Sequence, residues 1–209
     1  TPSTESLEEC RKMQNCGRDL VETVKTLQRA GLEVMGGFIV GFDNDPRDIF
    51  TRQFEFIQRS GVVTAMVGLL TALPETRLYR RLMKEGRLET ESTGNNTQAT
   101  LNFRPKLDRE FLVNGYRELM KKLYEPRNYY QRSRTFLEHN RPGGPRLRFA
   151  WSDVQAFVKS VWLLGVWHRG RQAYWRFCAT TLLRRPRQFH QAIALTIIGH
   201  HFRRVARSL

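Results

Sequence analysis

The stretch Gly36-Gly37-Phe38-Ile39-Val40-Gly41-Phe42-Asp43-Asn44-Asp45-Pro46 is a short apolar run with glycines at both ends that leads into an acidic turn. Such a run predicts a buried strand whose carboxyl end opens onto a ligand, because Gly41 has no Cβ and lets another molecule approach the backbone. Asp45 and Pro46 suit a helix start, with Asp45 as the N-cap and Pro46 as the first helical residue. Asp43 is assigned to the same turn. The stretch predicts one strand, loop and helix unit of an α/β enzyme.

The flanking sequence continues this alternation of helices and strands. Apolar spacing predicts, in chain order, helices Ser6–Cys16 and Asp19–Ala30, a strand Leu32–Val40, a helix Pro46–Ser60, a strand Val62–Leu70, and a turn Leu73–Tyr79 leading into a helix that ends near Gly86. Strands that alternate with helices of this length imply right-handed crossovers and a parallel sheet.

Two motifs in this region resemble those of radical S-adenosylmethionine (SAM) enzymes. Gly37-Phe38-Ile39-Val40-Gly41 matches the strand end of that family, and Pro74-Glu75-Thr76-Arg77-Leu78-Tyr79 matches the turn one unit later, except that Glu75 stands where glycine is usual. The opening Thr1–Leu7 is similar to the segment after the fourth strand of the family's barrel. A turn that needs a positive φ at Glu75 would be strained.

A closer resemblance is to cobalamin-binding radical SAM proteins, in which a helical domain of unknown function follows the barrel. It rests on four further segments: Arg18–Glu22, Gln28–Val34, Ala65–Leu70 and Asn128–Arg132. The resemblance implies an α/β fold class, namely the C-terminal portion of a partial (β/α)6 barrel followed by a mostly α-helical domain. We expect residues 1–90 to end the barrel, 91–140 to form a helical extension, and 141–209 to form a basic, Trp-rich helical tail.

The resemblance also implies where SAM would lie. Gly37, Ile39 and Gly41 would lie against the adenine and ribose, and the backbone near Leu69 and Leu70 would complete the adenine pocket. A purely structural explanation exists for each of these positions. The glycines permit close packing of strand and helix, and the leucines suit a core.

The cysteines do not supply the metal site of that family. Its chemistry needs Cys-x3-Cys-x2-Cys to hold three irons of a 4Fe–4S cluster, whereas Cys10, Cys16 and Cys178 have no such spacing. We assign no metal ligand and no catalytic residue, and we interpret the cysteines as free or structural thiols. We expect a C-terminal fragment of a longer enzyme, inactive alone, with the cluster motif upstream. No secretory signal or long uncharged span is visible, which predicts a cytoplasmic location.

Charge divides the chain. Residues 1–120 carry 17 basic and 17 acidic side chains, whereas residues 121–209 carry 18 basic and 3 acidic ones. Polar linkers are predicted at Glu91–Thr97 and Asn140–Pro145. Helices are predicted at Trp151–His168, Arg171–Leu183 and Phe189–Arg207.

A packed helix face is predicted in the basic tail from Val154, Phe157, Val158, Val161, Trp162, Leu164 and Val166. Three interpretations of the tail stay open. The first is a helical bundle whose cations are solvated. The second is a surface that contacts an anionic membrane through Trp and Arg, and the third is a nucleic-acid binder. The last ranks lowest because no nucleic-acid motif accompanies the charge.

The sequence leads to two alternative functional hypotheses. The first is a radical SAM enzyme, cobalamin-dependent by resemblance, that cleaves SAM to a 5′-deoxyadenosyl radical and methylates an unactivated, lipid-like carbon. The alternative is a non-catalytic basic helical module that binds an anionic membrane or nucleic acid. The first requires SAM and a 4Fe–4S cluster, with cobalamin in the full-length protein.

Overall fold

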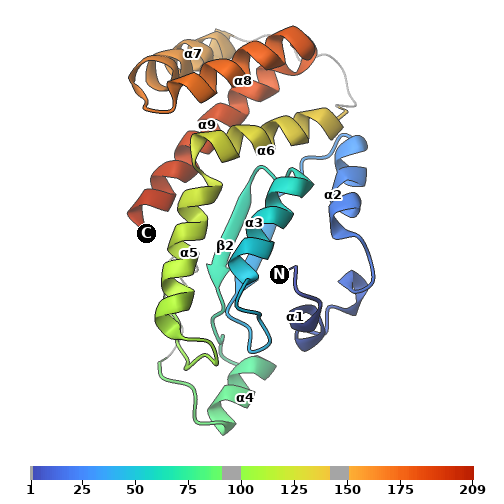
Figure 1. Ribbon diagram of the computed structural model, residues 1–209, viewed down its shortest axis with the longest axis vertical. Coiled ribbons are helices and arrows are strands. Elements are labelled where there is room, and N and C mark those ends of the chain that lie inside the picture. The colour runs from blue at the N-terminus through green and yellow to red at the C-terminus, as the bar shows by residue number, and fades with distance from the viewer. Residues whose placement is uncertain (1, 91–99, 142–150) are drawn as a thin grey trace.

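A computed structural model describes residues 2–90, 100–141 and 151–209. The first part holds helix α1 (Thr4–Glu9), the 3-10 helix η1 (Met13–Asn15), α2 (Leu20–Arg29), strand β1 (Gly36–Val40), α3 (Ile49–Ser60), strand β2 (Ala65–Leu69) and α4 (Arg77–Lys84). The rest holds α5 (Arg109–Leu123), α6 (Pro126–His139), α7 (Trp151–Ser160), the π-helix η2 (Val161–Trp167), α8 (Arg171–Arg184), the 3-10 helix η3 (Pro186–Gln188) and α9 (Phe189–Ser208). The described residues are mostly helical, with a small α/β unit (Figure 1).

The sheet consists of β1 and β2, which run parallel in a register from Gly36 opposite Ala65 to Val40 opposite Leu69. Successive side chains of a strand point to opposite faces. One face carries Phe38 and Val40 and is buried. Phe38 meets Phe56 of α3 edge to face, with ring centroids 5.8 Å apart, so α3 covers this face. The predicted strand, helix, strand order and the parallel pairing are confirmed, whereas the partial barrel stays a prediction.

The edge of β2 that faces away from β1 is closed by a side chain of the helical part. The Tyr124 hydroxyl donates to the Ala65 carbonyl (2.7 Å) and accepts from the Ala65 N–H (3.2 Å). The carbonyl of the preceding residue, Thr64, accepts from the Gly36 N–H of β1 at 3.0 Å. The backbone groups of Thr64 and Ala65 therefore form hydrogen bonds on opposite edges of the strand. Tyr124 is fully buried and therefore anchors α5 to the sheet.

The helices α6 to α9 pack on one another at one end of the molecule (Figure 1). The ring of Tyr130 on α6 stacks on Phe177 of α8 at 5.0 Å, and the Tyr129 hydroxyl donates to the Leu195 carbonyl of α9 at 2.7 Å. Arg203 of α9 donates to the Tyr124 carbonyl at 2.9 Å. Helix α9 thus runs from this end of the molecule towards the sheet.

Several predicted boundaries are corrected by the structure. The helix expected over Ser6–Cys16 is broken into α1 and η1, because Arg11 between them adopts a left-handed φ of 57°. The helix expected over Trp151–His168 exists, but its second half is the π-helix η2. The predicted linker Glu91–Thr97 and residues 142–145 of the linker Asn140–Pro145 lie outside the described residues.

The predicted packed face of the tail is only partly correct. Leu164 is buried, and Phe157 and Val161 are partly buried. By contrast, Trp162 is 63% exposed, and Val154, Val158 and Val166 are exposed as well. For Trp162 and Val166, which belong to η2, the widened π-helical turn changes the register that was assumed for an α-helix. Val154 and Val158 lie on the exposed side of α7. None of the helices among the described residues is long and apolar enough to cross a bilayer.

Candidate functional site

The carboxyl ends of β1 and β2 lie side by side, and the chain leaves β1 through a turn that only glycine suits. Gly41 has a φ of +107°, a conformation that residues with a Cβ rarely adopt. The Leu70 N–H donates to the Val40 carbonyl at 2.8 Å, which extends the pairing one residue beyond each strand. The sequence prediction for Gly41 was a close approach of a ligand to its backbone, and that stays a prediction.

Asp45 holds this turn in place and is not the N-cap of the next helix, contrary to the sequence prediction. Its carboxylate accepts from the Gly41 N–H (2.7 Å), the Phe42 N–H (3.0 Å) and the Ser6 hydroxyl (2.6 Å). Helix α3 begins at Ile49 instead, after Asp48. Burial raises the pKa of the Asp45 carboxyl, although the three hydrogen bonds act in the opposite direction.

Asp43 ties the turn to distant parts of the chain. Arg87 donates to both of its carboxylate oxygens, at 2.7 and 2.9 Å, and Arg81 of α4 donates to one of them at 3.1 Å. Arg81 also donates to Glu9 at 2.9 Å. The Arg87 guanidinium lowers the pKa of the Asp43 carboxyl. Beyond its predicted role in the turn, the buried Asp43 carboxylate therefore accepts from two partly exposed arginines in one ion-pair network.

Glu75, which replaces the usual glycine of the turn motif, adopts a φ of +64°. The turn therefore keeps the conformation for which glycine is usual, although Glu75 had put that conformation in doubt, and a positive φ costs strain in a residue with a Cβ. The Glu75 carboxylate accepts from exposed Arg80 at 3.0 Å. A surface pair of this kind offsets little of that strain.

A cavity of about 490 Å³ lies on the exposed face of the sheet. Four of the five predicted site residues line it: Gly37, Ile39, Leu69 and Leu70. The fifth, Gly41, lies outside the lining. Ile39 is 42% exposed, and Gly37 and Met66 beside it are also exposed.

The far wall of this cavity comes from the helical part of the chain, which sequence reasoning missed. Its side chains are Tyr116 and Met120 of α5 together with Phe202, Val205 and Leu209 at the end of the chain. Phe202, Val205 and Leu209 follow helical spacing, and that spacing was the available signal. The spacing alone does not show which part of the protein these residues contact.

The lining is predominantly apolar, and this decides what the cavity can hold. An apolar cavity with Ile39 on one side and aromatic and aliphatic side chains of α5 and α9 on the other suits the faces of a planar aromatic ring such as adenine. Gly37 leaves room above the strand, since a Cβ built there meets nothing within 4 Å. The residues present therefore fit the adenine side of SAM.

The same residues do not fit an iron–sulfur cluster. Cys10, Cys16 and Cys178 are free cysteines, and no group of His, Cys, Asp or Glu side chains among the described residues is placed to hold a metal ion. Cys178 lies in the core, where burial raises the pKa of its thiol to about 11. It is therefore an unreactive thiol at neutral pH.

Residues 76–209 match the family described as Domain of unknown function (DUF4070). The chain is 35% identical to a protein of Synechocystis named an uncharacterized methyltransferase and 26% identical to the hopanoid C-2 methylase of Rhodopseudomonas palustris. These alignments cover 97% and 96% of the chain but only 38% of each relative. No solved structure matches the chain significantly. The chain therefore belongs to the DUF4070 family, whose domain is found in cobalamin-binding radical SAM proteins.

Proposed function

We propose that this chain forms the adenosine side of the SAM site of a radical SAM enzyme that methylates an unactivated carbon. The observation that carries the proposal is the convergence of Gly37, Ile39, Leu69 and Leu70 on one apolar cavity. The family match and the names of the two relatives support the methylation chemistry. We further propose that β1 and β2 complete a partial (β/α)6 barrel in the whole protein, with this cavity on its inner side.

In this proposal the chain binds and orients SAM, and other parts of the protein generate the radical. Ile39 and the α5 and α9 side chains exclude water from the adenine, while Asp45 fixes the turn at Gly41. When bound, the 4Fe–4S cluster supplies the electron that cleaves SAM. The proposal assigns no residue of this chain to the cluster or to cobalamin. The substrate class we propose is a lipid-like molecule, since one relative is named a hopanoid methylase.

The reaction is tested on the whole protein that contains this chain. The protein is reconstituted anaerobically with iron and sulfide and incubated with SAM and a strong reductant, and 5′-deoxyadenosine is measured by mass spectrometry. We expect 5′-deoxyadenosine to form in proportion to cluster content. Iron-loaded, folded protein that leaves SAM intact would contradict the proposal.

As a second role, we propose that the basic tail contacts an anionic membrane surface from the cytoplasm. Large apolar side chains of α7, η2 and α8 are exposed together, a set we call the tryptophan surface: Val158, Trp162, Leu163, Val166, Trp167 and Trp175. Trp162 and Trp167 lie with ring centroids 6.4 Å apart, and the Trp175 indole donates to the Gly165 carbonyl of η2 at 3.0 Å. These contacts hold η2 against itself and against α8, so the exposed side chains of the set lie on neighbouring elements.

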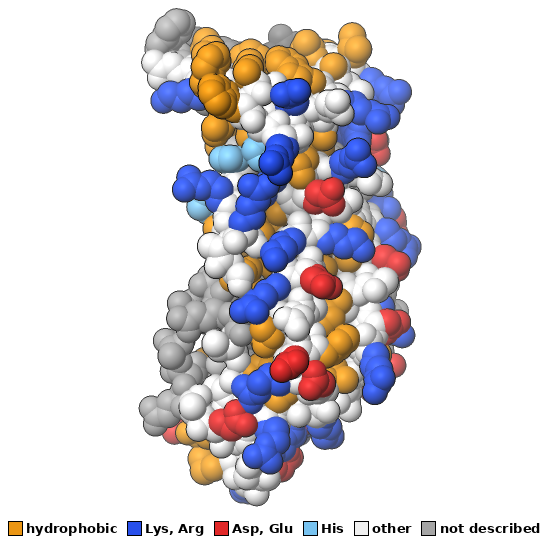
Figure 2. All heavy atoms as spheres, turned by 60° about the vertical axis from the view of Figure 1, so that its left-hand side comes forward, with side chains coloured by type: hydrophobic (Ala, Val, Ile, Leu, Met, Phe, Trp, Pro, Cys, Tyr) orange, Lys and Arg blue, Asp and Glu red, His pale blue; other side chains and the backbone are white. Residues whose placement is uncertain are grey.

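Charge around this surface favours an anionic membrane. Figure 2 shows hydrophobic side chains gathered at one end of the molecule, with Lys and Arg side chains directly below them. Arg169 and Arg171 are exposed beside Trp167. Indole rings partition to the headgroup region, where nearby cations meet lipid phosphates.

Cosedimentation with vesicles tests this role. We expect stronger binding to phosphatidylglycerol vesicles than to phosphatidylcholine vesicles, and we expect the double substitution Trp162→Ser, Trp167→Ser to weaken binding about tenfold. The matched control replaces Leu32 and Met35, which are exposed on the loop between α2 and β1, by Ser. Equal pelleting with both vesicle types, or equal loss in both variants, would overturn the proposal.

A further inference from the structure

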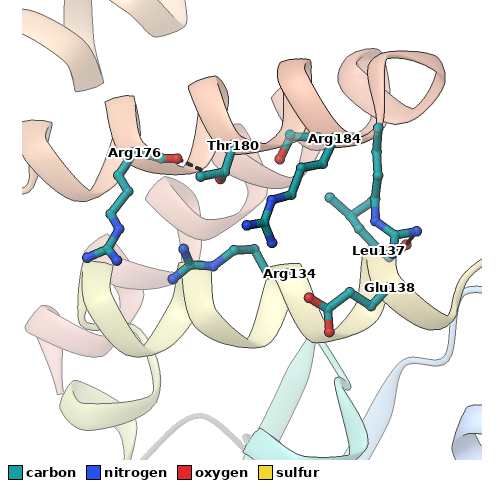
Figure 3. A pocket seen from close by; sticks show the side chains of 8 residues that line it. Arg134, Leu137, Glu138, Arg176, Thr180 and Arg184 are labelled. Carbon is teal, nitrogen blue, oxygen red and sulfur yellow. Dashed lines mark hydrogen bonds between the residues drawn. The ribbon is translucent and has the colours of Figure 1, made fainter.

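A second hollow, of about 190 Å³, lies between α6 and α8. We call it the arginine hollow. It is lined by Arg134, Leu137 and Glu138 from α6, by Arg176, Thr180, Thr181 and Arg184 from α8, and by Arg185. Figure 3 shows Arg134 extending from α6 towards α8, while Arg176 and Arg184 extend from α8 towards α6. Their guanidinium groups face the same gap.

Three of these guanidinium groups have no hydrogen bond or ion pair within the described part of the chain: Arg134, Arg176 and Arg184. Arg185 is fixed differently, since it donates to the Leu137 carbonyl at 3.1 Å. Arginines near the sheet behave otherwise, as the pairing of Arg81 and Arg87 with Asp43 shows. The hollow thus concentrates unneutralised positive charge.

This arrangement costs free energy as long as no anion is present. Arg134 is half-buried. Burial and the charge of Arg176 lower the pKa of Arg134 by more than the charge of Glu138 raises it. The guanidinium stays protonated, because arginine keeps its proton at any physiological pH. Glu138 supplies one carboxylate to the lining, but it is exposed and forms no ion pair with these arginines among the described residues. An anion in the hollow would offset both the burial and the repulsion.

The hydrogen-bond donors that line the hollow indicate which kind of anion it can bind. The Thr180 hydroxyl donates to the Arg176 carbonyl at 2.6 Å, and the Thr181 hydroxyl donates to the Phe177 carbonyl at 2.8 Å. Guanidinium groups are therefore the free donors that face the gap. Guanidinium forks match the oxygen spacing of phosphate and bind it through paired hydrogen bonds.

We propose that the arginine hollow binds a phosphate group. The group belongs either to a soluble phosphate compound or to the headgroup of an anionic lipid. This site is distinct from the SAM cavity, whose lining comes from β1, β2, α5 and α9 with the segment after β2, and it does not depend on the proposed methylation. It adds a specific anion site to the general positive charge of the tail.

The test measures binding to the whole protein by calorimetry, with inorganic phosphate and glycerol 3-phosphate as soluble probes and phosphatidic acid vesicles as the lipid probe. The variant Arg176→Gln, Arg184→Gln removes two guanidinium groups that are exposed, so the fold is retained. The charge-matched control, Arg127→Gln, Arg187→Gln, removes two exposed arginines that lie outside the hollow and outside the tryptophan surface. We expect at least about tenfold weaker binding in the first variant and no comparable change in the control.

The probes separate the two sources of phosphate. Weaker binding of the soluble probes in the hollow variant supports a soluble phosphate ligand. An effect confined to phosphatidic acid vesicles supports a lipid headgroup. Equal weakening by both double substitutions shows a diffuse charge effect and overturns the proposal, as does a wild-type protein that binds none of the probes.

Discussion

Replacing Arg132 by Met is expected to lower the free energy of unfolding by about 3 kcal/mol, the largest stability effect that we predict for a single side chain. Arg132 is fully buried, with 0% of its surface exposed. Its guanidinium donates to the Gln58 side-chain carbonyl (2.8 Å), the Leu123 carbonyl (3.1 Å) and the Val63 carbonyl (3.2 Å). Met keeps the packing volume but removes the donor of two buried backbone carbonyls and of the part-buried Gln58 side chain.

The position of Arg132 explains why its loss would be felt widely. Its partners come from α3, from the last turn of α5 and from the segment before β2. The guanidinium also lies 5.5 Å from the ring centre of Tyr124, the residue that closes the edge of β2. Helix carbonyls carry partial negative charge at the C-terminus, which favours a cation at Leu123.

Denaturant unfolding of both variants checks this prediction. Arg127→Met is the matched control, because Arg127 begins the same helix and is exposed. We expect the control to change stability by less than about 0.5 kcal/mol. A similar loss in both variants would show that charge removal from α6, rather than the buried contacts, destabilises the protein.

Local signals in the sequence were sufficient for the elements around the sheet. The glycine-flanked apolar run predicted β1, and the φ of +107° at Gly41 is compatible with the glycine that ends this run. Asp19 is the N-cap of α2 through bonds to Val21 and Glu22, as its position before an amphipathic run suggests. These features depend on neighbours within a few residues.

The misinterpreted features depend on partners far along the chain. Asp45 has the local chemistry of an N-cap, but the Ser6 hydroxyl and the Gly41 and Phe42 amides take its oxygens. For Arg132 the sequence led to no prediction of burial, and the fold surrounds its guanidinium with carbonyls from distant segments. Long-range pairing of this kind leaves no periodic trace in a single sequence.

The candidate site shows the same division. The motif around Gly37 and Ile39 located the sheet side of the cavity, because strand alternation puts both residues on one face. The opposite wall, formed by residues such as Met120 and Phe202, depends on how α5 and α9 dock. Trp162 and Val166 were expected to pack because an α-helical register was assumed where η2 is a π-helix.

Replacing Gly37 by Leu is expected to weaken SAM binding by about tenfold to a hundredfold while leaving the fold intact. The result rests on the proposed function. Gly37 lines the cavity, and a Cβ built on it meets no atom within 4 Å. Its φ is not in the positive range, so Leu adopts the strand backbone without strain and its side chain occupies the space proposed for adenine. Gly37→Ala, with a smaller side chain, should have an intermediate effect.

Gly36 supplies the contrast that separates blocking from unfolding. A Cβ at Gly36 would lie 2.5 Å from the Phe38 ring on the buried face, so Gly36→Ala should lower the thermal unfolding temperature without adding a group to the cavity. Equilibrium dialysis of SAM against the iron-loaded protein, together with thermal unfolding, measures both quantities. If a folded Gly37→Leu protein bound SAM with wild-type affinity, SAM would not bind in this cavity, even if 5′-deoxyadenosine were still formed. The enzyme class and the location of its SAM site are therefore tested independently. Formation of 5′-deoxyadenosine tests the class, and the loss of SAM affinity with a larger side chain at Gly37 tests the location.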